Sequence, residues 1–435
     1  MLIKIEKIVA GGFGLGRLPG GMVVFVRHVL PGEEVRVRER RRRRGYIEAE
    51  LEQVESPSPH RVEPRCPLYG RCGGCDLQHA ASGMQQLIKE DIVREAMQRA
   101  GVEEPEGGID SLIPSPRAFR YRRRLRLVVR RQGELGFRRH RSRETVAVAA
   151  CFLAERELDA VLASTAEYGL HPCPATRYRE LELVLNSVDR RVHLVPVARS
   201  GRISRRRGRR RRPVSLSGGV ESFAWPSGGA RAFSCDRSRE NTVLYQKITL
   251  EALKKTVETA WGPACFSQVN ERQNERLVNL VCSLAGDISG KNVIDLYCGM
   301  GNFSVPLALL GGRVTGIEEN GESVRWAEIN MRRAEIGNGR ILQMDAAAGL
   351  DVAAAQGEKT DLLLLDPPRR GAAEIMKRVL RILPERIIYI SCDPATLMRD
   401  LRRLTPKPYG LRRLIPLDMF PQTHHIECIT LLEKN

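Results

Sequence analysis

Cys392 and Glu427 are the two residues whose types and settings could carry covalent chemistry on a pyrimidine ring. Cys392 follows an apolar run at 386–391, and Glu427 ends the segment 422–427. A pyrimidine C5 is too poor a nucleophile to take a methyl group directly. A thiolate that adds to C6 raises the electron density at C5, and a carboxylate can later remove the C5 proton so that elimination expels the thiolate. Because a cysteine is more often a small buried residue than a nucleophile, the assignment depends on its neighbours.

Acidic residues and a glycine loop stand at the ends of three predicted strands. Residues 295–302 read Asp-Leu-Tyr-Cys-Gly-Met-Gly-Asn, and Glu318 and Asp345 end the next two strands. Ligands of an open α/β sheet bind beyond the carboxyl ends of its strands, where Glu318 could accept bonds from ribose hydroxyls and Asp345 could read an adenine amino group. Each acid alone is explained by a helix cap. The full dinucleotide fingerprint is missing. Together with that absence, the acidic residues at successive strand ends favour an adenosyl ligand that carries a positive sulfonium.

The segment Asp366-Pro-Pro-Arg369 follows a fourth apolar strand at 360–366. The prolines stiffen the loop and leave Asp366 and backbone carbonyls exposed to a substrate. Enzymes that methylate amino groups often carry an aromatic residue after such a pair of prolines, and cytosine-5 RNA methyltransferases usually carry a cysteine there. Arg369 occupies that position, so both classes are disfavoured.

Cys66, Cys72 and Cys75 lie within ten residues, with two glycines between the last pair. A redox Cys-x-x-Cys pair normally opens a helix, whereas these cysteines fall in a glycine loop. A metal site would need a fourth ligand from elsewhere, and both zinc and iron–sulfur clusters accept four cysteines. The spacing alone leaves zinc and iron–sulfur open. It is not the Cys-x3-Cys-x2-Cys of radical enzymes, which disfavours radical chemistry.

The charge balance indicates a polyanionic partner. The chain has 71 Lys and Arg against 52 Asp and Glu, a net charge of +19, and arginine suits forked phosphate contacts. We therefore favour a nucleic acid as partner. The basic runs at 40–44 and 205–212 fit the same picture, although the second could equally be a solvated loop.

No apolar run approaches the ~20 residues that cross a bilayer, and the N-terminal strand does not resemble a signal peptide. We expect a cytoplasmic protein without a membrane partner, monomeric as suits an enzyme that engages a large RNA. The 11 cysteines are then more plausible as ligands, nucleophiles or core residues than as disulfides.

Three domains are predicted to position these residues. Short strands with glycine turns over 1–57 indicate a small barrel of the oligonucleotide-binding type. Residues 58–245 form a central α+β domain with the cysteine cluster and a basic surface, and its helix at 84–100 could pack on the last domain. Alternating strands and helices over 246–435 predict a doubly wound, mostly parallel α/β sheet of Rossmann-like type.

The assembled motifs resemble the bacterial RNA uracil-5-methyltransferase family, of the type that acts on 23S ribosomal RNA, and the front end resembles a TRAM domain. The matching pieces are Phe266-x-Gln268-Val269-Asn270, Asp295–Phe303, Asp366-Pro-Pro-Arg-x-Gly371, Ser391-Cys-x-Pro-Ala-Thr-Leu397 and Gln422-Thr-x-His-x-Glu427. The resemblance implies that Cys392 is the nucleophile and Glu427 the base. It also implies that Asp366 lies between cofactor and uracil, and that S-adenosylmethionine is contacted by Gln268, Tyr297, Asn302, Glu318 and Asp345.

The same resemblance implies a [4Fe–4S] cluster on Cys66, Cys72 and Cys75, with Cys151 as fourth ligand. Family members often have proline after that cysteine, whereas Phe152 follows here. Cys173, which Pro174 follows, is therefore a rival ligand. Methyl transfer needs no electron, so the expected role of the cluster is structural or RNA-organising.

Two alternatives differ in substrate or class. One is methylation of uridine 54 in transfer RNA, and the other is an RNA-binding iron–sulfur protein without catalysis. Intact Cys392, Glu427 and Asp366 argue against the second. The main hypothesis requires that residues 392 and 427 converge at the same sheet edge as the glycine loop 299–301.

Overall fold

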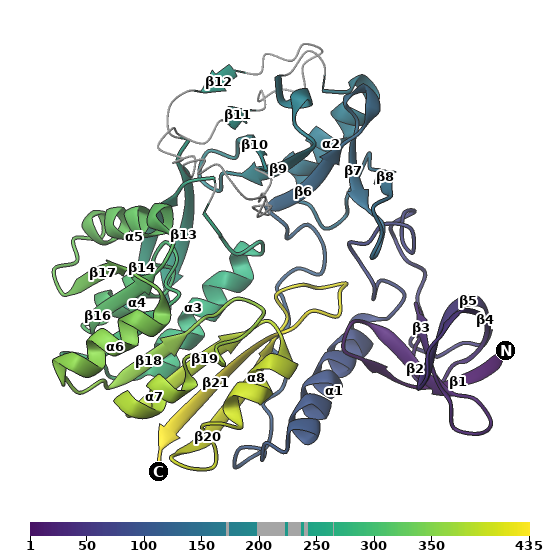
Figure 1. Ribbon diagram of the computed structural model, residues 1–435. Coiled ribbons are helices and arrows are strands. Elements are labelled where there is room, and N and C mark those ends of the chain that lie inside the picture. The colour runs from purple at the N-terminus through teal and green to yellow at the C-terminus, as the bar shows by residue number, and fades with distance from the viewer. Residues whose placement is uncertain (171–173, 198–221, 225–235, 239–241, 264) are drawn as a thin grey trace, which may run out of the picture. The chain divides into compact units, whose positions relative to one another are not determined.

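The computed structural model describes residues 1–170, 174–197, 222–224, 236–238, 242–263 and 265–435 (Figure 1). The basic run at 205–212 and Cys173 lie outside these ranges. Two compact units result, and they are described separately: the first is Met1–Phe119, Ile248–Val257 and Arg272–Asn435, and the second is Arg120–Lys247 and Glu258–Glu271. Residues 58–119 thus group with the first unit, and the predicted division into three domains stays a prediction.

The N-terminal strands close into a barrel in the order β1-β2-β3-β5-β4. Side chains alternate between exposed and buried over the first four residues of β1 and of β4, as expected for strands with one face on a core. A Cβ on Gly14 would lie 2.2 Å from Val29, so the barrel interior needs a glycine there. The strands are β1 (Leu2–Val9), β2 (Phe13–Arg17), β3 (Val23–Arg27), β4 (Glu34–Arg42) and β5 (Tyr46–Ser56).

The C-terminal part of the first unit is built on a seven-stranded sheet in the order β17-β16-β15-β18-β19-β21-β20. The first five strands of this order are parallel, whereas β21 runs antiparallel to both β19 and β20. The strands are β15 (Asn292–Leu296), β16 (Arg313–Glu318), β17 (Gly339–Gln343), β18 (Leu362–Leu365), β19 (Arg386–Ser391), β20 (Tyr409–Leu417) and β21 (Glu427–Lys434).

Helices cover both faces of this sheet, which explains why the central strands are apolar throughout. All four residues of β18 are fully buried. One hydrophobic cluster joins the sheet to α1, α6, α7 and α8, and another joins it to α3, α4 and α5. The helices are α1 (Ser82–Ala100), α3 (Glu271–Ala285), α4 (Ser304–Leu309), α5 (Gly321–Arg333), α6 (Ala346–Gln356), α7 (Met376–Ile382) and α8 (Pro394–Leu401).

Helix α1 connects the barrel to the sheet within the first unit. Val93 and Met97 belong to the core that contains α8 and β19, while Ile88 and Ile92 belong to the core of the barrel. The helix therefore packs on the C-terminal sheet, as its sequence allowed, and it ends at Gly101 in the left-handed conformation that favours glycine.

The second unit contains a sheet in the order β12-β11-β10-β9-β6-β7-β8. Two arginines at the start of β6 make their contacts within this unit. Arg123, directly before the strand, is 1% exposed and donates to the Gln268 carbonyl, while Arg124 is paired with Glu182. The elements are β6 (Arg124–Val129), β7 (Leu135–Arg138), β8 (Thr145–Ala147), α2 (Arg156–Tyr168), β9 (Glu180–Leu185), β10 (Val192–Pro196), β11 (Ser222–Ala224) and β12 (Asp236–Ser238).

Two further strands, β13 (Leu244–Leu250) and β14 (Lys255–Trp261), form a separate two-stranded sheet. Across the described ranges, none of the helices has the length and apolar character needed to span a membrane.

Candidate active site

The antiparallel pairing of β19 with β21 brings Cys392 and Glu427 together. Ser391 pairs with Cys428, and continuing that register by one residue sets Cys392 opposite Glu427. Glu427 also pairs with Leu417 on its other side. Cys392 is half-buried and Glu427 is 4% exposed. The two residues that covalent chemistry requires thus leave the sheet at one edge and on neighbouring strands.

The glycine loop lies at the same edge, two strands away. The Cys298 N–H donates to the Ile317 carbonyl at 3.2 Å, which fastens the loop to the end of β16. The Gly299 N–H donates to the Glu318 carboxylate at 3.1 Å. Between the loop and Cys392 lies β18, and the Asp366 N–H that follows it approaches the Leu296 carbonyl. The predicted convergence of residues 392 and 427 with the loop is therefore present.

Burial and mutual repulsion raise the pKa values of the groups at this edge. Burial raises the pKa of the Cys392 thiol to about 11, and the charge of Glu427 adds to the effect. Burial also raises the pKa of Glu427 well above its usual range, with a further contribution from Asp366. The pKa of Asp366 rises to about 7 through loss of solvent. Such perturbed groups at one sheet edge are typical of an active site.

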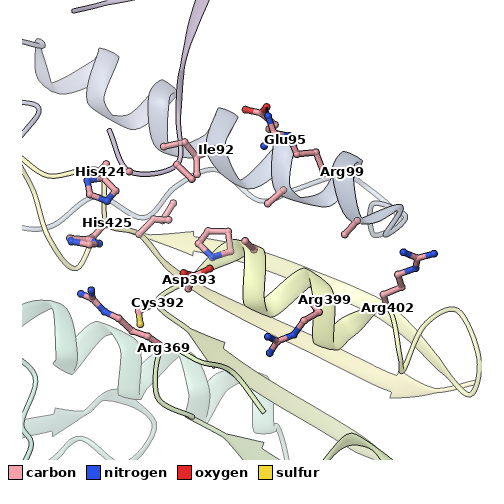
Figure 2. A pocket seen from close by; sticks show the side chains of 17 residues that line it. Ile92, Glu95, Arg99, Arg369, Cys392, Asp393, Arg399, Arg402, His424 and His425 are labelled. Carbon is pink, nitrogen blue, oxygen red and sulfur yellow. Dashed lines mark ion pairs between the residues drawn. The ribbon is translucent and has the colours of Figure 1, made fainter. Parts of the chain in front are cut away.

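A cavity of about 580 Å³ opens in front of Cys392. Its walls come from the turn after β1, from α1, from the start of α8 and from residues 424–426. Figure 2 shows Arg369 and His425 beside Cys392 at one end, with Arg99 and Arg402 toward the other. The arginines that line it are Arg99, Arg369, Arg399 and Arg402. The cavity therefore offers positive charge to an anionic ligand that reaches the thiol.

The residues predicted to contact the cofactor have distinct local roles. Tyr297 is half-buried with φ +63°, a strained value for a side chain-bearing residue. The Asn302 and Asn274 amides exchange hydrogen bonds of 2.9 and 3.1 Å. Asp345 caps α6, since one carboxylate oxygen accepts from the Ala347 and Ala348 N–H groups. Asp345 therefore acts as a helix cap. Its contact with adenine stays a prediction.

Asp295 opens the loop 295–302, but the sequence assigned it no separate role in the site. It is fully buried, and burial raises its pKa to about 7. The Ser304 hydroxyl donates to its Oδ2, whereas in the described part of the chain its Oδ1 has no hydrogen-bond partner. A buried carboxylate oxygen without a partner, close to the Glu318 carboxylate, fits a ligand with hydroxyl and positively charged groups.

Comparison with known proteins decides the family. Residues 244–435 match the family described as tRNA (Uracil-5-)-methyltransferase, and residues 1–51 match the TRAM domain. A 23S rRNA (uracil(1939)-C(5))-methyltransferase, RlmD, from Pseudomonas entomophila is 32% identical over 99% of this chain and 93% of its own. RlmD of Acinetobacter baumannii is 33% identical over 95% of this chain and 89% of its own. This chain belongs to the RNA uracil-5-methyltransferase family.

A solved structure agrees at the level of the fold. The tRNA (uracil-54, C5)-methyltransferase of Pyrococcus abyssi, in complex with S-adenosyl-L-homocysteine, superposes with a TM-score of 0.68 at 22% identity. The superposition covers 99% of this chain and all of the other. The superposition confirms the predicted Rossmann-like fold of this uracil-5-methyltransferase. The family and domain matches confirm the TRAM barrel, S-adenosylmethionine as methyl donor and RNA as substrate.

Arg369 is the second residue of this methyltransferase that sequence reasoning undervalued. The sequence used it only to exclude other reaction classes. In the structure it lines the cavity, and its charge opposes the rise in the pKa of both Cys392 and Glu427. The feature of the sequence that could have indicated this role is the position of Arg369 in the loop that follows a parallel strand.

Gln268 and Cys151 belong to the second unit, so their predicted roles stay predictions. The Gln268 side chain is 9% exposed. The Cys151 N–H donates to Asp159 at 2.6 Å, and the residue is half-buried.

The cysteine loop lies in the first unit between β5 and α1. Cys66, Cys72 and Cys75 are half-buried thiols, and the Cys72 N–H donates to the Leu68 carbonyl at 2.8 Å in a tight turn. Reduced thiols on a turning loop are the right donors for an iron–sulfur cluster or zinc. However, within the ranges that the structure describes, no three His, Cys, Asp or Glu residues form a metal-binding group. The predicted cluster is not shown, although its donors fit.

Proposed function

We propose that this enzyme methylates C5 of a uridine in 23S ribosomal RNA through a covalent bond between Cys392 and C6 of the base. The observation that carries the proposal is the strand register that sets Cys392 opposite Glu427. It is supported by an arginine-lined cavity that opens onto the same thiol. A nucleophile and a base on opposite strands could work on two adjacent carbons of a single ring.

The steps need Cys392, Glu427 and the methyl donor. The Cys392 thiol loses its proton to solvent, its sulfur adds to C6, and the electron pair of the C5–C6 double bond moves toward C5 and O4. S-adenosylmethionine, when bound, would supply an electrophilic methyl group to C5 and leave as S-adenosylhomocysteine. Glu427 then accepts the C5 proton, and the C6–S bond breaks as the C5–C6 double bond re-forms. Asp366, between β18 and the cavity edge, is proposed to orient the base.

Arg369 is proposed to favour the ionised forms of both reagents. Its charge lowers the pKa of the Cys392 thiol and of the Glu427 carboxyl against the effect of burial. The thiol needs to lose its proton before it attacks, and Glu427 needs to be ionised before it accepts one. One guanidinium at the mouth of the cavity therefore serves both steps.

Ribosomal RNA is favoured over transfer RNA by the relatives. Three curated proteins that match nearly the whole chain at about one-third identity are named for uracil 1939 of 23S rRNA. The tRNA enzyme shares the fold at lower identity. We propose the corresponding uridine as target. Mapping 5-methyluridine in a strain that lacks the gene should show its loss from 23S rRNA, and loss from tRNA instead would overturn this assignment.

Covalent trapping tests the mechanism. RNA that contains 5-fluorouridine has no C5 proton to release, so the enzyme and its methyl donor should form a complex that survives denaturation. Cys392→Ala should abolish it, whereas Cys282→Ala, a buried cysteine on α3, should retain it. No adduct with the wild-type protein would support binding without catalysis, and an adduct with Cys392→Ala would show that another residue attacks.

We also propose a [4Fe–4S] cluster on Cys66, Cys72 and Cys75, with Cys151 as fourth ligand. The cluster would hold the cysteine loop in shape and take no part in methyl transfer. Anaerobically purified protein should contain iron and sulfide and absorb visible light, and Cys151→Ala should lose iron. Stoichiometric zinc without visible absorbance would contradict the iron assignment, and full iron in Cys151→Ala would exclude that ligand.

A further inference from the structure

The loop between β20 and β21, residues 418–426, forms one wall of the active-site cavity. His424, His425 and Ile426 line the cavity together with Cys392, and Glu427 follows directly. The loop contains no helix or strand. Its internal ties are short-range, such as the bond of 2.8 Å from the Thr423 hydroxyl to the Phe420 carbonyl. Its shape therefore depends on what it binds outside itself.

One set of these external contacts joins the loop to the residues that follow Cys75. The N–H groups of Asp76 and Leu77 donate to the Gln422 carbonyl at 3.2 and 3.1 Å. The Asp76 carboxylate in turn accepts from the His424 N–H at 2.7 Å and contacts the His424 Nδ1 at 2.6 Å. Asp76 is only 8% exposed, so these charge-assisted bonds are shielded from water.

The start of α1 holds the same loop at its turn. Gln422 has φ +69°, a left-handed conformation, and its backbone N–H donates to Gln85 Oε1 at 3.0 Å. Gln85 Nε2 donates back to Gln422 Oε1 at 3.1 Å. A residue in this conformation is stable only when its surroundings fix it. The segment 76–85 supplies that fixation.

Contacts between aromatic rings connect His424, which Asp76 holds, to the cavity. The His424 and His425 rings lie 4.2 Å apart with an interplanar angle of 38°, and the His425 ring meets Phe420 edge-on. Figure 2 shows His425 between His424 and the Cys392–Arg369 end of the cavity. The position of the His425 ring thus depends on where Asp76 holds His424.

We propose that Asp76 and His424 are positioning residues: they tie the cysteine loop to the active-site wall and hold the His425 ring in front of Cys392. The inference rests on the proposed function and deepens it, because it assigns the cysteine loop a route to the catalytic residues. Without the pair, the loop 418–426 would lose its fixed shape and the substrate base would be oriented less well over Cys392. A misplacement of this kind lowers turnover by about tenfold to a hundredfold.

Matched variants separate this role from a general loss of stability. Asp76→Ala removes both bonds to His424, whereas Asp76→Asn keeps an acceptor for the His424 N–H and can donate to Nδ1. Asp110→Ala is the control, because Asp110 also contacts the β20–β21 hairpin with both carboxylate oxygens, which bind Arg413 at 2.9 and 2.7 Å. His424→Ala tests the partner and serves if Asp76→Ala fails to fold.

The assay follows kcat and KM for a 23S rRNA fragment, together with hydrogen exchange of residues 418–427. We expect Asp76→Ala and His424→Ala to lower kcat by about tenfold or more and to speed exchange in that loop, with Asp76→Asn close to wild type. Equal kcat values for Asp76→Ala, His424→Ala and Asp110→Ala would overturn the inference. Wild-type protein without a 5-fluorouridine adduct would instead count against the proposed function.

Discussion

At the scale of single residues, burial shifts both proposed reagents toward their protonated forms. It raises the pKa of Cys392 to about 11 and that of Glu427 well above the usual carboxyl range. The Cys392 thiol is therefore largely protonated at neutral pH. Because each acts only after ionisation, raising the pH increases the reactive fraction of both.

The pH dependence of kcat/KM tests whether ionisation of the two groups controls the rate. We expect kcat/KM to rise between about pH 6 and about pH 9. Arg369→Gln should shift the profile to higher pH, since it removes the charge that lowers the pKa of both groups, and Arg369→Lys should shift it back. A profile that is flat, or one that Arg369→Gln leaves in place, would contradict the electrostatic role of Arg369.

Removal of the base should stall the reaction after methyl transfer. In Glu427→Gln the C5 proton has no acceptor, so a covalent complex with ordinary uridine RNA should accumulate and turnover should fall by about 10²–10⁴. Denaturing gels and mass spectrometry would detect the methylated adduct. Glu433→Gln, on the same strand but partly exposed, is the control and should turn over normally.

At the scale of elements, the sequence predicted the strands better than the contacts between loops. Apolar runs located β15, β16, β18 and β19 and the polar residues at their ends, because buried parallel strands have an unmistakable composition. The strand expected at 341–345 instead ends at Gln343, since Asp345 turns to cap α6. A closing strand pair predicted at 411–419 and 426–432 matches β20 and β21 within two residues at every end.

The Asp76–His424 contact could not be predicted in this way. Its residues are far apart in sequence, and neither periodicity nor propensity records which loops meet. The electrostatic role of Arg369 was hidden for the same reason, because it depends on groups from two other strands. The sequence shows which residue types stand at strand ends. Contacts between loops that are far apart in sequence depend on how the chain packs.

A buried ion pair between α1 and the active-site loop offers a stability test. The Lys89 ammonium, 0% exposed, contacts Asp418 at 2.5 Å. Lys89→Met leaves the Asp418 carboxylate buried without its counter-ion and should cost about 3–5 kcal/mol of the free energy of unfolding. Urea unfolding measures the loss. Lys89→Met with Asp418→Asn should lose less than the single variant, and an equal loss would show that packing dominates.

At the scale of the whole molecule, the positive charge of the chain is only partly available to RNA. Arg123 and Arg124 make their polar contacts inside the second unit. At the cavity of the first unit Arg402 is exposed, whereas Arg99 pairs with Glu95 and Arg399 with Asp400. A net charge of +19 therefore says less about the binding surface than the placement of these side chains does.

The salt dependence of RNA binding measures how many phosphate contacts the cavity makes. If Arg402 binds a phosphate, Arg402→Gln should weaken RNA binding and reduce the slope of log K against log salt by about 1. Arg332→Gln is the control, because α5 packs with the hydrophobic cluster that does not include α1 or α8. Unchanged slopes for both variants would place the RNA backbone outside this cavity.

The antiparallel pairing of β21 with β19 affects which mutations this enzyme tolerates. The proposed nucleophile and base lie one residue beyond the last pair of the β19–β21 ladder, Ser391 and Cys428. The spacing of their backbones is therefore set by hydrogen bonds that every amino-acid sequence makes. Conservative repacking beneath the ladder should leave the two reagents aligned. A single inserted residue early in β21 would turn the carboxylate to the opposite face of the sheet and leave a folded protein that attacks uridine without being able to finish.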